Sequence, residues 1–405
     1  MSGTPEHTHT HDRAFVIWLS LAQLITWGSV FYTFALLMEP LESELGFTRA
    51  QTSAAFSMAL LMEGLLAFLV GRWIDRGHER RVMTVGSLMM GAGLAAHTQV
   101  SGLIGFYAVW LWLGTAMAAT LYAPAFAVLT RRFASDFRRA IIVMTFLGGL
   151  ASTVFIPLSS WLIASLGWRE ALWVLAALQF GVCAPLHFFW LRGASRRADT
   201  PRTPPPDAAA PGLATHLRST AFLLVGFFVV GMAAVTAALP PHLINLLREA
   251  GLPSAWVILI PASIGVLQVI GRLLLYFFEH HVSVHRANAL IPCLIPLGLG
   301  LLLAGSGQAL LGLLFVLLYG MGNGLITIVK GTAIAQYVDR THVASLNGAL
   351  GVPQALARAA APLALGVLWT PEGGYGSGLA MLIAVSVLAV FGLWGAQRAA
   401  LGRIG

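Results

Sequence analysis

The chain has 405 residues, of which 58% are hydrophobic and only 10% are charged, and its mean hydropathy is +0.80. A soluble domain carries about 25% charged residues, and a disordered chain combines low hydrophobicity with high charge, so the composition excludes both classes. The formal net charge of +8 is not concentrated in a water-facing module, so no nucleic-acid partner is expected. The composition predicts an integral membrane protein with many spanning helices.

Apolar stretches of about 20 residues, long enough to cross a bilayer, recur along the chain. They cover residues 14–38, 51–73, 82–99, 102–129, 139–165, 170–191, 219–245, 254–278, 287–305, 308–330, 343–369 and 376–397. The polar residues 1–13 predict a tail, and residues 192–218, rich in Pro and Arg, predict a flexible linker. The sequence therefore predicts a six-helix bundle over 14–191, a second over 219–397, and a C-terminal tail over 398–405.

The basic residues lie mostly on one side of the predicted spans. That side, which includes both tails and the linker, receives 18 of the 24 Lys and Arg residues, whereas the other receives only Arg49, Arg169 and Arg248. Because basic loops stay in the cytoplasm, we expect a multi-pass protein of the bacterial inner (plasma) membrane with cytoplasmic termini. The two cysteines, Cys183 and Cys293, lie within apolar runs, so neither a disulfide nor a metal site is expected.

The loop after the second span reads Gly71-Arg72-Trp73-Ile74-Asp75-Arg76-Gly77-His78-Glu79-Arg80-Arg81. It resembles the cytoplasmic motif of the major facilitator superfamily, G-x-x-x-D-R-x-G-x-R-R, with a histidine where the second glycine usually stands. The resemblance implies an all-α polytopic membrane protein with twelve transmembrane helices in two pseudo-symmetric six-helix bundles. It also implies a conformational motif of Gly71, Asp75, Arg76 and Arg80, in which the glycine permits close helix approach and the aspartate pairs across the bundle interface.

Two further segments resemble the bacterial monocarboxylate-porter branch of that superfamily. One is Trp27-Gly28-Ser29-Val30-Phe31-Tyr32 in the first span, followed by Leu45-Gly46-Phe47-Thr48-Arg49-Ala50, and the other is Gly167-Trp168-Arg169-Glu170 before the sixth span. The resemblance implies transport of a monocarboxylate together with a proton.

Four charged residues lie inside predicted spans, where charged side chains are rare: Glu63, Arg272, Lys330 and Arg358. A charge at mid-bilayer costs about 2.5–3.5 kcal/mol on insertion scales, so such residues usually mark a pathway or face a partner. Arg272 follows Gln268 by four residues, which puts both on one helix face. The monocarboxylate porters carry an acid and an arginine at this spacing, and their arginine holds the substrate carboxylate; here glutamine replaces the acid. The alternative is that Arg272 only snorkels to the interface.

Lys330 is expected at the end of the tenth span, on one polar stripe with Asn323 and Thr327. It is either a second contact for the anion or a snorkelling side chain. Arg358 shares a face with Gln354 and is either a ligand contact or a partner for a helix end.

Tyr32 continues a stripe of Gln23, Thr26 and Ser29 that is expected to face a cavity. Tyr32 is therefore a candidate substrate contact, although tyrosines in membranes are more often interface anchors. Glu63 is the candidate proton carrier, because burial raises a carboxyl pKa toward the working range. The alternatives for Glu63 are a structural acid, or a salt bridge to Arg358 or Lys330.

These observations predict a secondary transporter that moves a small organic anion, a monocarboxylate, with a proton by alternating access. It is expected to work as a monomer in the lipid bilayer. The alternatives are an exporter of amphipathic drug-like compounds, and a receptor that does not transport. The sequence has no Gly-x-Ser-x-Gly and no phosphate-binding loop, so neither an enzyme nor a cofactor is expected.

Overall fold

The computed structural model describes residues 5–133, 137–192, 213–278, 281–305, 307–339 and 343–401. Most of the predicted linker, residues 1–4 of the N-terminal tail, residues 402–405 of the C-terminal tail and Arg340 lie outside the described residues. Within them the structure is almost entirely helical, and its one pair of bridging backbone residues joins Thr370 to Gly374.

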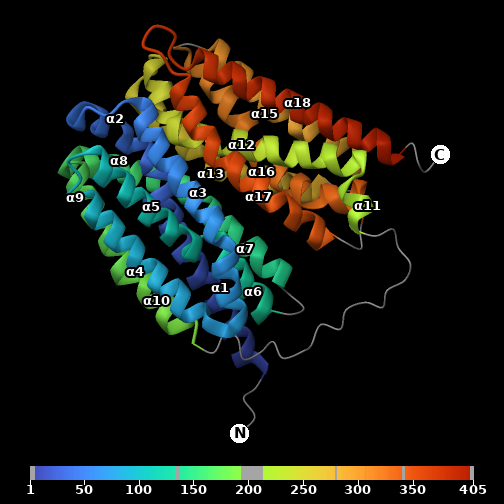
Figure 1. Ribbon diagram of the computed structural model, residues 1–405, viewed down its shortest axis with the longest axis horizontal. Coiled ribbons are helices and arrows are strands. Elements are labelled where there is room, and N and C mark those ends of the chain that lie inside the picture. The colour runs from blue at the N-terminus through green and yellow to red at the C-terminus, as the bar shows by residue number, and fades with distance from the viewer. Residues whose placement is uncertain are drawn as a thin grey trace. The chain divides into compact units, whose positions relative to one another are not determined.

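The chain divides into two compact units, Met1–Pro201 and Arg202–Gly405. In Figure 1 the first unit runs from blue to green and the second from yellow-green to red. The helices of the first unit are α1 (Pro5–Thr26), η1 (Trp27–Tyr32), α2 (Phe34–Leu45), α3 (Arg49–Trp73), η2 (Ile74–His78), α4 (Glu79–His97), α5 (Leu103–Thr120), α6 (Tyr122–Arg132), α7 (Phe137–Gly149), α8 (Ala151–Leu166), α9 (Trp168–Leu178), η3 (Gln179–Cys183) and α10 (Ala184–Trp190). Those of the second unit are α11 (Leu213–Leu217), α12 (Thr220–Glu249), α13 (Ser254–Phe278), α14 (Val284–Leu290), η6 (Ile291–Cys293), α15 (Leu294–Ala304), α16 (Ala309–Tyr337), α17 (Val343–Val367) and α18 (Gly376–Leu401).

Eleven helical segments of the described chain are long and apolar enough to cross a membrane. One of them, Arg49–His97, has 49 residues and at a rise of 1.5 Å per residue would measure about 74 Å, more than twice the bilayer core of about 30 Å. Gly77 interrupts it with a φ of 83°, so α3 and α4 are separate spans. Counted in this way, the described residues contain the twelve spans that the sequence predicts.

The two units pair their helices by the same scheme. In the first unit α5 packs against α3 and α4, and in the second α16 packs against α13 and α15. Likewise α1 packs against α7, and α12 against α17, whereas α4 packs against α9, and α15 against α18. This repetition gives the two pseudo-symmetric six-helix bundles of the expected fold.

Several predicted spans are broken within the membrane. The stretch 102–129 is one example: α5 ends at Thr120 and α6 begins at Tyr122, because Pro124 has no N–H to offer the Thr120 carbonyl and its ring clashes with the carbonyl four residues earlier. The Nε2 group of Gln23 donates to that carbonyl oxygen instead, at 2.6 Å. The break is thus stabilised by a polar side chain from another span.

Candidate functional site

The backbones of α13 and α16 cross in close contact in the second unit. A Cβ atom on Gly324 would lie 2.3 Å from the carbonyl oxygen of Gln268, and one on Gly271 would lie 3.0 Å from that of Met321. Only glycine permits this approach from each side, and the crossing brings the polar residues of the two helices together. Gln268 is buried there, and Asn323 is half-buried beside Gly324.

Arg272 lies one turn beyond Gln268 and is turned onto α16. Its Nε donates to the carbonyl oxygen of Gly324 at 3.1 Å, and its Nη2 lies 3.5 Å from the Thr327 hydroxyl. The Thr327 hydroxyl donates to the same carbonyl at 2.6 Å. The half-buried guanidinium is therefore held against a neighbouring helix of its own unit, rather than extended along α13 as a snorkelling side chain would be.

Lys330 lies three residues after Thr327 and is half-buried. The prediction that it ends its span is wrong, since α16 continues to Tyr337. Its charge interacts with that of Arg358 on α17, and the side chain of Arg358 is half-buried as well. We call Arg272, Lys330 and Arg358 the cationic cluster: three positive side chains from α13, α16 and α17 in one unit.

The first unit holds the other candidates. Tyr32 ends the π-helical turn η1, is half-buried, and has its ring 5.4 Å from that of Phe31. Glu63 is half-buried in the middle of α3 and makes contacts within the structure.

The rest of the stripe in the first span does not face a cavity, contrary to expectation. Gln23, Thr26 and Ser29 are fully buried and bond to other helices of the first unit. Gln179 Nε2 donates to the Ser29 hydroxyl at 2.8 Å, and the Thr26 hydroxyl lies 3.9 Å from the Cys183 sulfur. Thr26 and Ser29 therefore join the first span to the sixth, and Gln23 joins it to the fourth.

The sequence did not predict why these polar side chains of the first and sixth spans meet. Ser29 lies in η1 and Gln179 in η3, so two π-helical turns meet here. A π-helical turn shifts the backbone hydrogen bonds to wider spacing; Thr33 N, for example, donates to the carbonyl oxygen of Gly28 at 3.1 Å. A Cβ on Gly28 would lie 2.0 Å from the ring of Phe155, so this glycine fits η1 against α8.

The loop motif forms the turn between α3 and α4. Gly77, rather than the residue at 78, takes the left-handed conformation with φ 83°, so the turn has its glycine one position earlier than the family pattern. Arg80 donates from Nε to the carbonyl oxygen of Phe188 at 2.7 Å, and its guanidinium lies 3.8 Å from the Phe188 ring centroid. Arg131 of α6 donates to the carbonyl of Ile74.

The other residues of the loop motif make fewer contacts with the rest of the structure. Asp75 and Arg76 are exposed, and a Cβ atom on Gly71 would meet no described atom within 4 Å. Glu79 was not predicted as a candidate, yet it is only 3% exposed, and its Oε2 has no hydrogen-bond partner among the described residues. It stands in the first turn of α4, where the helix dipole stabilises a negative charge.

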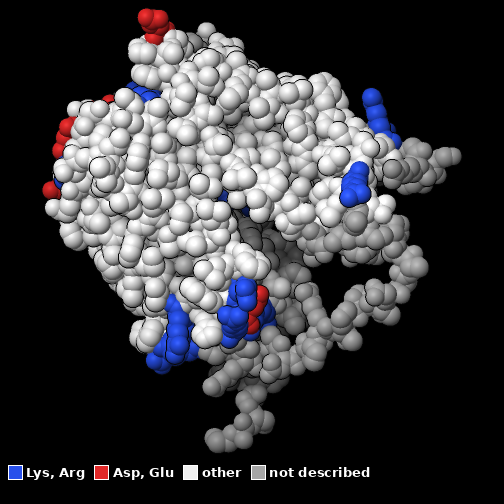
Figure 2. Space-filling view, in the orientation of Figure 1, with Lys and Arg blue, Asp and Glu red and all other residues white. Residues whose placement is uncertain are grey.

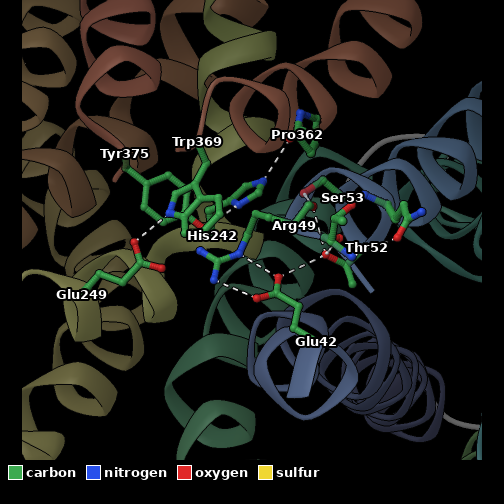
Figure 3. Close-up of polar contacts among 11 residues, drawn as sticks. Glu42, Arg49, Thr52, Ser53, His242, Glu249, Pro362, Trp369 and Tyr375 are labelled. Atoms are coloured by element: carbon green, nitrogen blue, oxygen red, sulfur yellow. Dashed lines mark hydrogen bonds and ion pairs between the residues drawn. The ribbon is translucent and has the colours of Figure 1, made fainter. Parts of the chain in front are cut away.

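Figure 3 shows polar contacts at the ends of the first spans of the two units. In the first unit, Arg49 holds Glu42 through two bonds of 2.7 and 2.8 Å. In the second unit, His242 bonds to the hydroxyl of Tyr375 and the carbonyl of Pro362, each at 3.0 Å.

One contact repeats in both units. The indole nitrogen of Trp168 donates to Glu44 at 2.5 Å, and that of Trp369 donates to Glu249 at 2.9 Å. Each glutamate lies at the end of the first span of its unit; Trp168 is the first residue of α9, and Trp369 lies between α17 and α18. Arg169 adds an ion pair to Glu44.

The comparisons with known proteins agree with this fold. The family profile of the Major Facilitator Superfamily matches residues 19–362, and a search of curated protein sequences gives no match. The chain is similar to the solved nucleoside transporter NupG at 16% identity and a TM-score of 0.69, over 95% of this chain and 98% of that one. It is similar to a bacterial homologue of the human lysosomal transporter Spinster, in an inward-facing and occupied conformation, at 14% identity and a TM-score of 0.73, over 99% of both chains. It is also similar to tetrameric PepTSo2 at 13% identity and a TM-score of 0.68, over 97% of both chains. At these identities the structural likeness shows the fold alone.

The family profile covers most of the chain, and the fold, the repeated helix pairing and the loop between α3 and α4 fit that family. The chain belongs to the Major Facilitator Superfamily.

Proposed function

We propose that the protein is a proton-coupled secondary transporter of a small organic anion, a monocarboxylate, that works by alternating access. Membership of the superfamily supports transport across a bilayer. The observation that carries the choice of an anion is the cationic cluster: Lys330 and Arg358 interact, and Arg272 contacts Thr327, three residues before Lys330 on α16.

Electrostatics favours an anion at this place. Lys330 and Arg358 carry like charges close enough to interact, and in a medium of low polarity such repulsion is larger than in water. A bound carboxylate reduces it. Arg272 adds a guanidinium, whose planar set of donors matches the two oxygens of a carboxylate. Gln268 and Asn323 supply neutral hydrogen-bonding groups beside it, and Tyr32 is the proposed contact from the first unit.

Glu63 is the proposed proton carrier. It is half-buried in the middle of α3, a position that would give it access to water in one state of the transporter. Loading and release of this proton would alternate with those of the anion.

We infer the following organisation for transport. Bundles 14–191 and 219–397 rock about the site as a monomer, and linker 192–218 permits their relative motion. The arginine-rich ends, including the motif Gly71, Asp75, Arg76 and Arg80, face the cytoplasm of a bacterial cell, as do both termini. Reporter fusions at the two termini that are active only outside the cytoplasm test this orientation, and we expect both to be inactive.

Proteoliposomes with an imposed pH gradient test the proposal. Uptake of labelled carboxylates is measured alongside uptake of labelled nucleosides and short peptides, the substrates named for the structural neighbours. We expect carboxylate uptake, reduced at least tenfold by Arg272→Gln and by Lys330→Gln. The matched control is Arg286→Gln, which removes an exposed arginine of α14 outside the cluster. Failure to take up any anion, or undiminished uptake by Arg272→Gln, would remove the anion from the proposal.

Counterflow separates proton coupling from substrate binding. With Glu63→Gln, net uptake should no longer respond to the pH gradient, whereas exchange of labelled for unlabelled anion at equal pH should continue. A response to the gradient equal to that of the unaltered protein would exclude Glu63 as the carrier. Binding without any counterflow would instead support a receptor that does not transport.

A second candidate is an exporter of amphipathic compounds, which an aromatic group in the first unit favours. The ring of Trp27 lies 5.0 Å from Phe31 and 4.9 Å from Tyr122, and Tyr122 stacks on Phe126 at 5.3 Å. The indole nitrogen of Trp27 is buried without a hydrogen-bond partner among the described residues. Increased drug sensitivity on deletion, with no anion uptake by the purified protein, would favour this candidate.

A further inference from the structure

A groove of about 500 Å³ lies on the first unit between α3, α4 and α5, next to the turn η2. Its walls are largely apolar, and three of the wall residues are well exposed: Leu69 at 41%, Trp73 at 44% and Val85 at 52%. They belong to a segment apolar enough to span a membrane, so these side chains lie outside the packed interior, at a surface that lipid can reach. The groove is therefore open to the bilayer.

One end of the groove is positively charged. Arg76, His78 and Arg81 line it at the turn η2, whereas Met89 and Thr115 line its far part. Met89 lies eight positions after Arg81 on α4, which is about 12 Å at 1.5 Å per residue. Figure 2 shows that basic side chains gather at the lower end of the first unit in this view, near the labels of α10 and α1 in Figure 1, with some acidic side chains among them.

The basic residues of the turn divide into two sets. Arg80 is bonded to the Phe188 carbonyl and Arg131 to the Ile74 carbonyl, so these two fix the local structure. Arg76 and Arg81 are exposed and line the groove, and the described part of the chain shows no hydrogen bond or ion pair from either. Asp75, the acid of this turn, does not line the groove. Two arginines are thus available at the end of an apolar groove.

We propose that this groove binds one anionic phospholipid, with its phosphate between Arg76 and Arg81 and an acyl chain along the apolar wall. Basic pockets between spanning helices at the membrane surface suit anionic headgroups, and burial of each methylene of the chain contributes about 0.8 kcal/mol. Trp73 lines the groove beside η2, and indole rings are favoured next to lipid headgroups. The groove belongs to the first unit and the cationic cluster to the second. The lipid proposal therefore does not depend on the identity of the transported substrate.

Native mass spectrometry of the full-length protein in detergent tests the proposal, with added phosphatidylglycerol or phosphatidylcholine of the same acyl chains. We expect the first phosphatidylglycerol to bind at least tenfold more tightly than phosphatidylcholine. The double variant Arg76→Gln, Arg81→Gln should reduce this preference to less than twofold. The control Arg286→Gln, which removes an exposed arginine from the second unit, should keep the full preference.

A second variant tests the acyl chain. Val85→Trp fills the groove from an exposed position and leaves both arginines in place, so it should weaken phosphatidylglycerol binding at least fivefold. Glycerol 1-phosphate, which has the phosphate but no chain, should compete only at a concentration more than 100-fold higher. Thermal unfolding of each variant without added lipid checks that it is folded.

Three outcomes would overturn the proposal. Equal binding of the two lipids would remove the phosphate contact, and a preference retained by the double variant would place the headgroup elsewhere. Undiminished binding by a folded Val85→Trp variant would show that the acyl chain does not occupy the groove.

Discussion

Two buried histidines differ in how their ring nitrogens are satisfied. The Pro362 carbonyl only accepts, so Nε2 of His242 carries the proton and donates to it, and Nδ1 accepts from the Tyr375 hydroxyl. His97 is also fully buried, but neither of its ring nitrogens has a hydrogen-bond partner among the described residues. Instead its ring packs 5.5 Å from Phe106. We infer that the first histidine stabilises its unit by hydrogen bonding and the second by packing.

Replacing each histidine by phenylalanine should separate these roles. His242→Phe removes the hydrogen bonds to the Pro362 carbonyl and the Tyr375 hydroxyl, at a cost of about 1–3 kcal/mol each, and should lower the thermal unfolding midpoint in detergent by several degrees. His97→Phe loses no described hydrogen bond and removes a buried polar group, so its midpoint should stay within about one degree or rise. Equal losses in the two variants would contradict this assignment.

Gly324 is the residue on which the site geometry depends most directly. The Cβ of Gly324→Ala would meet the backbone of Gln268 at 2.3 Å from its carbonyl oxygen, and backbone atoms cannot rotate away. We expect α13 and α16 to separate, with a loss of about 1–3 kcal/mol and loss of the Arg272 contact to α16. Gly331→Ala is the matched control in the same helix, because its Cβ would meet nothing within 4 Å.

Thermal unfolding and anion binding are measured for both glycine variants. Gly331→Ala should be as stable as the unaltered protein or slightly more so, since alanine favours a helix over glycine by about 1 kcal/mol. If Gly324→Ala leaves both thermal stability and anion binding unchanged, the close crossing of α13 and α16 is wrong.

At the scale of elements, the tryptophan–glutamate contact links the ends of three spans in each unit. Trp168 is only 6% exposed, and its partner Glu44 also pairs with Arg169, whereas Trp369, which donates to Glu249, is half-buried. Trp168→Phe should therefore lower the thermal unfolding midpoint more than Trp369→Phe does. The reverse order would contradict the inference that burial and the Arg169 ion pair make the first contact the stronger of the two.

The sequence predicted where a span begins and ends better than it predicted the breaks within the spans. Residues 254–278 were predicted as the eighth span, and α13 covers the same residues, because an apolar run with a polar loop on each side defines its own ends. The break at Leu121 and the π-helical turns were not predicted, since they depend on which neighbour satisfies the backbone. The Thr120 carbonyl is satisfied by Gln23, 97 residues away.

The same limit applies to the candidate site. The spacing of Gln268 and Arg272 placed both on one helix face, but only the fold shows that Arg272 bonds to Gly324 rather than extending to the interface. Lys330 was misplaced because the residues after it are less apolar, although α16 continues through them. The Tyr337 hydroxyl accepts from Asn288 of α14 and from Gln397 of α18, and such tertiary contacts extend this helix beyond its hydrophobic stretch.

At the scale of the whole molecule, each half of the chain has the properties of a folding unit. The two compact units meet in sequence at Pro201 and Arg202, and each pairs its own six spans by the same scheme. Separate cores in one chain indicate that most stabilising contacts of a span are made within its own half. The covalent connection between the halves then mainly raises their effective concentration.

A chain divided at this point should still assemble. Residues 1–201 and 202–405, co-expressed as two polypeptides with a tag on the first, should purify together in detergent and recover at least half of the anion uptake per complex. Each half expressed alone should insert into the membrane but show no uptake, because alternating access needs both bundles. The control is a division within the first unit, between Val100 and Ser101, which separates α5 from α3 and α4 and should abolish assembly. Equal recovery from both divisions would mean that the boundary between the units has no special role in folding, and no recovery from either would mean that the linker itself is essential.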